Sequence, residues 1–342
     1  MVKATIIPIP GDQVLKSIKS LEALGEIDSD GANNIMWLYN FAKANSLSYS
    51  ALGRAVGLDG STINRLFTAN YQAGYTGLMA KIAKFRMLTE ERQAKRDIGF
   101  IETSTWRKIE AVCRNALIEQ MPSFIYGASQ IGKTTCLREF ARRNNHGTTK
   151  YLRMPAATTF SHFIATLAKA CFINPHDRIT VIRDRIIDAL DSRNLLIIDE
   201  FHQALCTVSD SLAAKIVEYI REIYDRAGCG IVLAATRIGE EELERGRQHM
   251  IYDQLRRRGM TKLVLPDMPP LDDIYLIAEA HGLPRPPADT LKVIKEMLAT
   301  SGLGMYCKYL AAAEAMCNKR QTALTWDAFG AVWDGMRALS GN

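Results

Sequence analysis

The segment that most constrains this chain is GASQIGKT at positions 127–134, which matches the pattern GxxxxGK[ST]. It lies between an apolar run at 124–126 and a helix-compatible segment at 135–143. A glycine-rich loop between a strand and a helix presents backbone N–H groups to phosphate oxygens at the helix N-terminus. In this pattern Lys133 reaches the β- and γ-phosphates, and the Thr134 hydroxyl binds Mg²⁺. The segment therefore predicts a nucleotide site, and the alternative is a plain glycine turn into a helix.

A second motif completes the predicted site. Residues 195–198 are an uninterrupted apolar run that ends at Asp199 and Glu200, as in a buried parallel strand with two carboxylates at its C-terminal edge. Asp199 is the expected Mg²⁺ ligand, directly or through water, and Glu200 is expected to orient the attacking water. Two acids after a strand also serve as helix caps. With the loop upstream we expect ATP and Mg²⁺ as cofactors and ATP hydrolysis as the reaction. The residues expected around the phosphates are Gly127, Ala128, Ser129, Gln130, Ile131, Gly132, Lys133, Thr134 and Thr135.

Length and composition fit about two domains plus an appendage, since the chain has 342 residues of which 47% are hydrophobic. No apolar run approaches the roughly 18 residues of a membrane helix, and the first ten residues lack the core of a secretory signal. We therefore expect a cytoplasmic protein without a membrane partner. The seven scattered cysteines form no CxxC pair, which argues against a disulfide framework or a zinc cluster. Residues 35–99 hold nine lysines and arginines against four acids, which predicts an anionic partner there.

That basic segment contains a helix-turn-helix pattern, with helices expected at 49–56 and 60–68 and a turn at Gly57 and Leu58. Gly53 permits a close approach of the two helices. Four polar side chains remain on the exposed face of the second helix as candidate contacts to duplex DNA: Ser61, Thr62, Asn64 and Arg65. Short helical units of this kind also bind proteins, and this alternative stays open.

Four parts are expected along the chain. They are a flexible arm at 1–32 with a short helix at 14–24, a helix-turn-helix domain with a charged linker helix at 33–97, an α/β ATPase domain at 98–268, and a helical lid at 269–342. Apolar runs alternate with helical patterns in the ATPase domain, which is typical of a parallel sheet. After the loop, these runs are 151–154, 195–198, 230–235 and 262–265.

Two further features are candidates for catalysis. Thr236 follows the run 230–235, where a polar side chain either faces the γ-phosphate and the lytic water or caps the end of the strand. The triplet Arg256, Arg257 and Arg258 precedes the last run. One of these arginines either acts as a finger in a neighbouring subunit's site, or the triplet faces DNA or solvent.

These motifs together resemble AAA+ ATPases, and their order is similar to that of the phage Mu B family of transposon target-selection ATPases. The resemblance spans about 48–319 and rests on the turn 57–59, the linker FIET at 100–103, the phosphate loop, IIDEFH at 197–202 and GIVL at 230–233. It implies an α/β AAA+ P-loop domain with a parallel sheet and a small helical lid, preceded by an all-α helix-turn-helix domain. It also implies that Thr236 takes the first sensor position and Arg258 the finger position.

The chain departs from the AAA+ pattern in two places. The first sensor is usually asparagine, and here it is threonine. Where many lids carry a sensor arginine, this chain has GLGMY at 302–306, with Lys308 as the nearest cation. We therefore expect slow hydrolysis that DNA or a partner protein stimulates.

The resemblance further implies that ATP-bound subunits assemble on duplex DNA, with each nucleotide between subunits, and stimulate a transposase or integrase. The assembly is expected to be a helical filament, with a ring as the alternative. DNA contacts on the ATPase domain are expected from Lys150, Arg153, Arg178 and Arg183. The segment 179–190 has an apolar face that leaves Arg178 and Arg183 outward, which fits either a solvated face or a phosphate-binding strip.

Two other functions remain open at this stage. A helicase loader or replication initiator would use the same fold with a replicative partner. An ATP-switched DNA-binding regulator would use nucleotide occupancy only to change its oligomeric state, so that Glu200→Gln would leave its activity intact.

Overall fold

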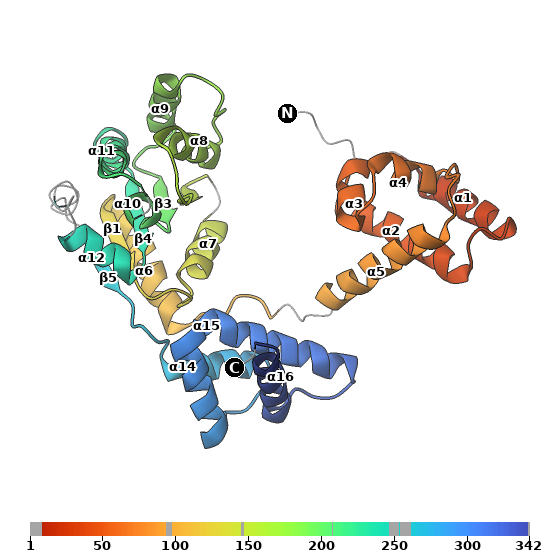
Figure 1. Ribbon diagram of the computed structural model, residues 1–342. Helices are drawn as coiled ribbons and strands as arrows, with labels where there is room; N and C mark the ends of the chain where they lie inside the picture. Colours follow the sequence, from red (N-terminus) through yellow and green to blue (C-terminus); the bar gives the residue numbers. More distant parts are fainter. Residues whose placement is uncertain are drawn as a thin grey trace. The chain divides into compact units, whose positions relative to one another are not determined.

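The structure is a computed structural model that describes residues 9–93, 98–144, 147–206, 208–245, 253 and 261–340. The chain divides into two compact units, residues 1–96 and 97–342. Figure 1 shows the first unit as a set of helices, red to orange, and the second as a sheet with helices, yellow to blue.

The smaller unit is built from helices around one apolar core. The helices are α1 (Gly11–Ala23), α2 (Ser29–Ala44), α3 (Tyr49–Val56), α4 (Gly60–Phe67) and α5 (Thr76–Gln93). The charged linker helix expected after the helix-turn-helix is the second half of α5, whose first half buries Leu78 and Ile82 in this core.

The flexible arm expected at 1–32 differs from what is observed. From Ile9 onward these residues belong to the smaller unit, and α1 buries Val14, Ile18 and Leu21 in its core. The Tyr39 hydroxyl donates a hydrogen bond of 3.0 Å to the Ile9 carbonyl. The physical reason is the apolar stripe at spacings of four and three residues, which needs a packing partner and finds it in the same unit.

Helices α3 and α4 lie at the predicted positions and are joined by a tight turn. Gly57 adopts a left-handed conformation with φ of +77°, and the Leu58 N–H donates to the Gly53 carbonyl at 2.7 Å. A Cβ atom on Gly53 would lie 2.6 Å from the Leu58 carbonyl oxygen. The turn therefore requires glycine at both positions, because one needs a positive φ and the other has no room for a side chain.

The larger unit contains a five-stranded parallel sheet with strand order β2-β3-β4-β1-β5. The strands are β1 (Pro122–Tyr126), β2 (Thr149–Arg153), β3 (Leu195–Asp199), β4 (Gly230–Ala235) and β5 (Thr261–Val264). All five coincide with the apolar runs identified in the sequence, and this confirms the predicted α/β fold class. Because the strands are parallel, their C-terminal ends lie along one edge, where ligands of such sheets bind.

Helices cover both faces of this sheet. Alternate strand residues, such as Ile198 and Leu233, pack into a core with α8 (Phe160–Ala170), α9 (Ile179–Asp188) and α11 (Asp210–Ala227). Their neighbours, such as Ile197 and Val232, pack on the opposite face with α6 (Ser104–Glu119) and α7 (Lys133–Arg143). Burial on both faces explains why these strands are apolar without alternation. Two short helices, α10 (Gln203–Cys206) and α12 (Arg237–Arg245), follow β3 and β4.

The C-terminal helices form the expected lid as a bundle with its own core, drawn in blue in Figure 1. They are α14 (Leu271–Ala280), α15 (Ala288–Lys319) and α16 (Trp326–Ser340). Helix α15 is interrupted at Gly302, where φ is +74°. In the part of the chain that the structure describes, no helix is long and apolar enough to cross a membrane.

Candidate nucleotide-binding site

The phosphate loop connects the end of β1 to the start of α7. Two of its residues adopt left-handed conformations, Gln130 with φ of +62° and Gly132 with φ of +101°. Gly127 packs closely enough that a Cβ atom there would lie 3.0 Å from the Cβ of Leu265. The first-turn N–H groups of α7 have no partner within the helix, so loop and helix together form a concavity that suits an anion.

Lys133 is folded onto the loop. Its Nζ donates to the carbonyl oxygens of Gly127 at 2.7 Å and Ala128 at 2.8 Å. Burial lowers the pKa of Lys133, while the carboxylates of Glu200 and Asp199 oppose that shift. Phosphate oxygens would give this ammonium group stronger, charged acceptors than the two carbonyls. We therefore expect the Lys133 ammonium group to move from these carbonyls to the phosphates of a bound nucleotide.

Asp199 ends β3 with its side chain buried at 1% exposure. Its Oδ2 accepts hydrogen bonds from the Thr134 hydroxyl at 2.7 Å and from the Tyr151 hydroxyl at 2.9 Å, and its Oδ1 accepts from the Glu200 N–H at 2.8 Å. Burial, followed by the Asp199 charge, raises the pKa of Tyr151 to about 12, so this hydroxyl stays a donor. Thr134 and Asp199 thus bring together the hydroxyl and carboxylate oxygens that Mg²⁺ takes as ligands in phosphate-binding loops.

Glu200 has a positive φ of +56°, a strained conformation for a residue other than glycine. Its carboxylate lies near two basic side chains, with Oε1 3.6 Å from a guanidinium nitrogen of Arg153 and Oε2 3.4 Å from Nε2 of His202. Burial lowers the pKa of His202, and Glu200 partly offsets this effect. At neutral pH the fixed positive partner of Glu200 is therefore Arg153, which ends β2 beside Asp199 in the sheet register.

A cavity of about 640 Å³ extends from the phosphate loop to the linker and the lid. Its lining includes Glu200, Thr236 and most of the loop, together with residues from 98–103, α14 and α15. The lid touches the loop directly, because the Gly304 N–H donates to the Gln130 carbonyl at 3.3 Å. A Cβ atom on Gly302 would lie 2.8 Å from the Cβ of Gln130. The GLGMY segment therefore packs glycine backbone against the loop where many AAA+ lids have an arginine, and Lys308 lines the cavity nearby.

Thr236 both faces the cavity and caps the helix that follows its strand. It lines the cavity beside Glu200, and its Oγ1 accepts a hydrogen bond of 3.4 Å from the Gly239 N–H at the start of α12. Its assignment as a sensor stays a prediction. Arg256, Arg257 and Arg258 lie outside the described residues.

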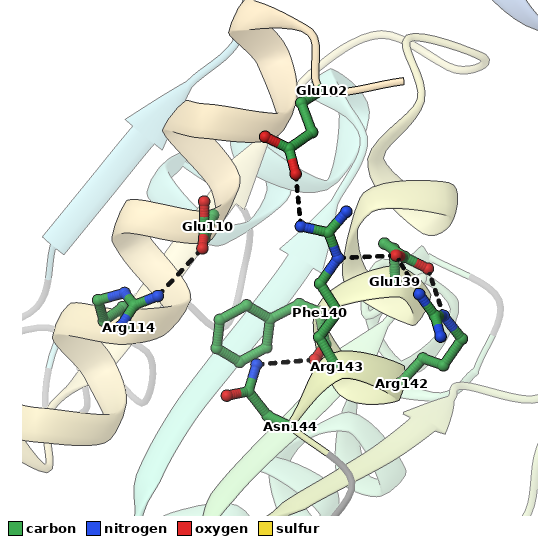
Figure 2. A network of polar contacts seen from close by, with 8 residues as sticks. All are labelled: Glu102, Glu110, Arg114, Glu139, Phe140, Arg142, Arg143 and Asn144. Carbon is green, nitrogen blue, oxygen red and sulfur yellow. Dashed lines mark hydrogen bonds and ion pairs between the residues drawn. The ribbon is translucent and has the colours of Figure 1, made fainter. Parts of the chain in front are cut away.

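A polar network fastens the linker to the helix of the phosphate loop (Figure 2). Arg143, in the last turn of α7, bonds to Glu102 at 2.6 Å and to Glu139 at 2.8 Å, and its guanidinium lies over the rings of Phe100 and Trp106. Arg142 and Arg143 hold the pKa of Glu139 at about 2. The network holds Glu102 of the linker, next to Phe100 and Ile101, which line the cavity.

The candidate DNA-contacting residues of α4 are largely exposed. Ser61, Asn64 and Arg65 face solvent, and Thr62 is half-buried, while Ile63 and Leu66 are buried on the opposite face. This arrangement agrees with the predicted division of the helix into an inner and an outer face. DNA binding by this surface stays a prediction.

The four candidate DNA contacts of the ATPase domain fall into two groups. Arg153 and Arg178 are exposed. Lys150 and Arg183 are not fully exposed, although the sequence suggested that both face solvent. Lys150 is buried with Nζ over the Phe172 ring. Arg183 is half-buried, with a bond of 2.5 Å to Glu222 and its guanidinium 4.8 Å from the centre of the Tyr219 ring. A charged residue type does not reveal such internal partners, and DNA contact by these four residues stays a prediction.

Sequence reasoning placed the loop, Asp199 and Glu200 but missed several of their neighbours. Tyr151 and the contact between Arg153 and Glu200 follow from the pairing of β2 with β3. The signal for both was the alignment of the two apolar runs, since parallel neighbours end at the same edge. His281 also lines the cavity, and its position at the end of α14 gave no such signal.

Comparisons with known proteins agree with this site. A family model described as an AAA domain matches residues 118–245, a range that contains the phosphate loop and both acids. The chain is also similar to the Mu-like prophage FluMu DNA transposition protein B of Haemophilus influenzae, with 25% identity over 191 residues. That match covers 55% of this chain and 63% of the relative, so the chain spans less than two thirds of the relative's length.

Solved structures show more distant likenesses. One is a Walker-type ATPase of Pyrococcus abyssi, with a TM-score of 0.46 and 12% identity, covering 72% of this chain and 75% of that chain. Another is Bacteroides Pif1 bound to ssDNA, with a TM-score of 0.29 and 18% identity, covering 58% of this chain and 50% of that chain. Neither is close enough to assign a function. The AAA domain match covers the part of the chain that holds the parallel sheet and its phosphate loop. Residues 118–245 thus match an AAA domain, and the chain resembles the Mu-like prophage transposition protein B.

Proposed function

We propose that this protein binds duplex DNA in its ATP-bound form, oligomerises on it and selects target DNA for a transposase, with slow ATP hydrolysis ending each cycle. The observation that carries the proposal is the likeness to transposition protein B in a chain that brings its predicted phosphate-binding residues together. Lys133, the Thr134–Asp199 pair and Glu200 all lie at one edge of one sheet, so the chain has the parts needed to bind and hydrolyse ATP.

The residues of this site divide the work of hydrolysis. Thr134 and Asp199 would hold Mg²⁺, which would neutralise charge on the phosphates. Lys133 leaves the carbonyls of Gly127 and Ala128 for the phosphate oxygens. Glu200 orients the water that attacks the γ-phosphate, and this role requires a carboxylate that is not tied to another cation.

The contact between Arg153 and Glu200 gives a route from DNA to hydrolysis. The Arg153 side chain is 58% exposed while its guanidinium stays within 3.6 Å of Glu200. A DNA phosphate is a competing acceptor for the same guanidinium. DNA binding at Arg153 would free Glu200 for the water and raise the hydrolysis rate, in line with the stimulated, slow ATPase expected from the sequence.

The smaller unit supplies a second surface for DNA. Exposed Ser61, Asn64 and Arg65 lie on one face of α4, which is the second helix of the predicted helix-turn-helix. Such a helix enters the major groove in DNA-binding modules of this type. A protein-binding role for this face would leave DNA binding unchanged when these residues are replaced.

Electron microscopy with long duplex DNA and a non-hydrolysable ATP analogue tests the proposal. The wild type should coat the DNA, and Lys133→Ala should not. Lys292→Ala is the matched control, because it removes the same charge from a side chain that is 82% exposed on the lid. Discrete rings or monomers from the wild type would contradict target-marking filaments and favour the helicase-loader function.

A second experiment separates a hydrolysis-driven cycle from a simple ATP switch. Glu200→Gln keeps the size of the side chain but removes its charge. In the proposed cycle this variant stays trapped on DNA with ATP and fails to support repeated transposition. Normal release and activity in the variant would instead favour the ATP-switched regulator.

A further inference from the structure

A buried histidine of the cavity wall, His281, is paired with a buried glutamate behind it. His281 follows α14 and Glu314 lies in α15, and their side chains are 6% and 9% exposed. Nδ1 of His281 lies 3.0 Å from Oε2 of Glu314, and His281 is among the residues that line the cavity. Burying two ionisable groups side by side is costly unless they are hydrogen-bonded, and the mechanism of hydrolysis uses neither.

The wall around His281 is otherwise apolar. It is formed by linker and lid residues, which include Ile98, Phe100, Ile101, Ile277, Leu303 and Cys307. Two polar exceptions have other positions or partners: the Thr103 hydroxyl caps α6 by accepting from the Trp106 N–H at 3.1 Å, and Lys308 is exposed. An apolar wall with one precisely held polar group is the usual composition of a surface that orients a flat, heteroaromatic ligand.

The pairing with Glu314 decides what the histidine ring offers to a ligand. A carboxylate only accepts hydrogen bonds, so Nδ1 must carry the proton that lies between the two groups. In the neutral ring, Nε2 is then an acceptor. An acceptor matches the 6-amino group of adenine and opposes the lone pairs of a 6-oxo group, as in guanine or hypoxanthine.

We propose that His281, held in this tautomer by Glu314, reads the 6-position of the nucleotide base and selects adenine. Glu314 is a positioning residue in this scheme, and His281 determines specificity. The inference rests on nucleotide binding in the proposed function, but it does not depend on DNA binding or on filaments.

Calorimetric titration of the full chain with ADP and IDP in the presence of Mg²⁺ tests this proposal without any turnover. The two nucleotides differ only at the 6-position of the base and the neighbouring ring proton. The titration is made at mildly alkaline pH. The wild type should bind ADP about ten- to a hundredfold more tightly than IDP, because IDP leaves a buried acceptor unpaired.

The variants separate recognition from folding. His281→Ala should lower the affinity for ADP about tenfold and leave IDP nearly unchanged. His281→Gln, a milder change, should bind both alike because its amide both donates and accepts. Glu314→Gln should narrow or reverse the preference for ADP over IDP, because the new amide donates to Nδ1 of His281 and leaves a proton on its Nε2. His162→Ala, an exposed histidine on α8, should keep the wild-type ratio.

Equal affinities of the wild type for ADP and IDP, or a wild-type ratio in both His281 variants, would overturn the inference while leaving the proposed function intact. A clear preference for ADP in a protein that forms no assemblies on DNA would overturn the proposed function while leaving the inference about His281 intact. Binding of neither nucleotide would overturn both.

Discussion

Replacing Asp273 with asparagine should destabilise the larger unit and loosen its lid. Asp273, in the first turn of α14, is 3% exposed. Its Oδ1 accepts from the Ser104 N–H at 2.7 Å. Its Oδ2 accepts from the Ser104 hydroxyl at 2.9 Å and from the Thr105 N–H and hydroxyl at 3.3 and 3.2 Å. One carboxylate of the lid thus satisfies the beginning of α6, which packs against the sheet.

The size of the effect follows from these four bonds. Asparagine keeps the acceptor for the Ser104 N–H but places an amide donor opposite the Thr105 N–H. The two hydroxyls can rotate to accept, whereas a backbone N–H cannot. One unpaired buried donor costs about 1–3 kcal/mol, and the lost negative charge at a helix N-terminus adds about 0.3–1 kcal/mol. We expect a total loss of about 2–3 kcal/mol, which lowers the Tm of a unit of this size by about 5–10 °C.

Differential scanning calorimetry of the full chain measures this shift. Asp272→Asn is the matched control, because Asp272 is also in the first turn of α14 but is exposed. It should change Tm by less than about 2 °C. The Asp273 variant should also bind ADP more weakly, since α14 carries Ile277 of the cavity wall. Equal Tm values for the two variants would refute the idea that this carboxylate joins the lid to α6.

Three further predictions concern other contacts. Arg153→Ala should raise the DNA-free ATPase rate up to about fivefold, since an exposed ion pair is worth about 1 kcal/mol at most, and it should reduce the stimulation of that rate by DNA. A steady-state ATPase assay measures both effects, with Arg193→Ala as the exposed control. An unchanged rate in Arg153→Ala would contradict the proposed link to Glu200. Because the pKa of Glu139 is lowered to about 2 from about 4.5, its charge stabilises the folded state above about pH 4.5, and this contribution is lost as the pH falls toward 2. Urea unfolding across that range should show a steeper loss of unfolding free energy in the wild type than in Glu139→Gln. Parallel plots of unfolding free energy against pH for the two proteins would disprove this assignment. Gly53→Ala should destabilise the smaller unit by about 1–3 kcal/mol, because its Cβ would lie 2.6 Å from a carbonyl oxygen. Thermal unfolding followed by circular dichroism measures this loss of stability, with Ala55→Gly, at an exposed site on the same helix, as the control. A loss of stability no larger than that of Ala55→Gly would count against the close packing.

Local patterns were sufficient for several parts of the structure. The central strands β3 and β4 were evident because a strand buried on both faces must be apolar along its whole length, whereas the edge strands β2 and β5 are only partly buried and carry shorter apolar runs. The phosphate loop was evident because its backbone path needs glycine at set positions, Gly127 and Gly132 among them. The Gly53–Gly57 turn was evident for the same reason. In each case the physical requirement lies within a few consecutive residues.

Other features depended on residues that are far apart in the chain. Residues 1–32 were assigned to a flexible arm, although α1 within this range packs its apolar stripe into the core of the smaller unit. Lys150 was assigned to the surface because charge alone does not show burial. The salt bridge of Arg153 with Glu200 needs the register of two strands separated by more than forty residues of sequence.

The sequence by itself indicated an α/β domain with a phosphate-loop motif, and it predicted Lys133, Thr134, Asp199 and Glu200 as the centre of a nucleotide site. Only the tertiary structure decided how the lid completes the cavity, where Gly302 and Gly304 pack on Gln130 and His281, paired with Glu314, joins the wall. The reason is that phosphate binding is a property of one short loop. Contacts to the rest of a nucleotide come from separate elements, and packing of the whole unit sets the distances between them.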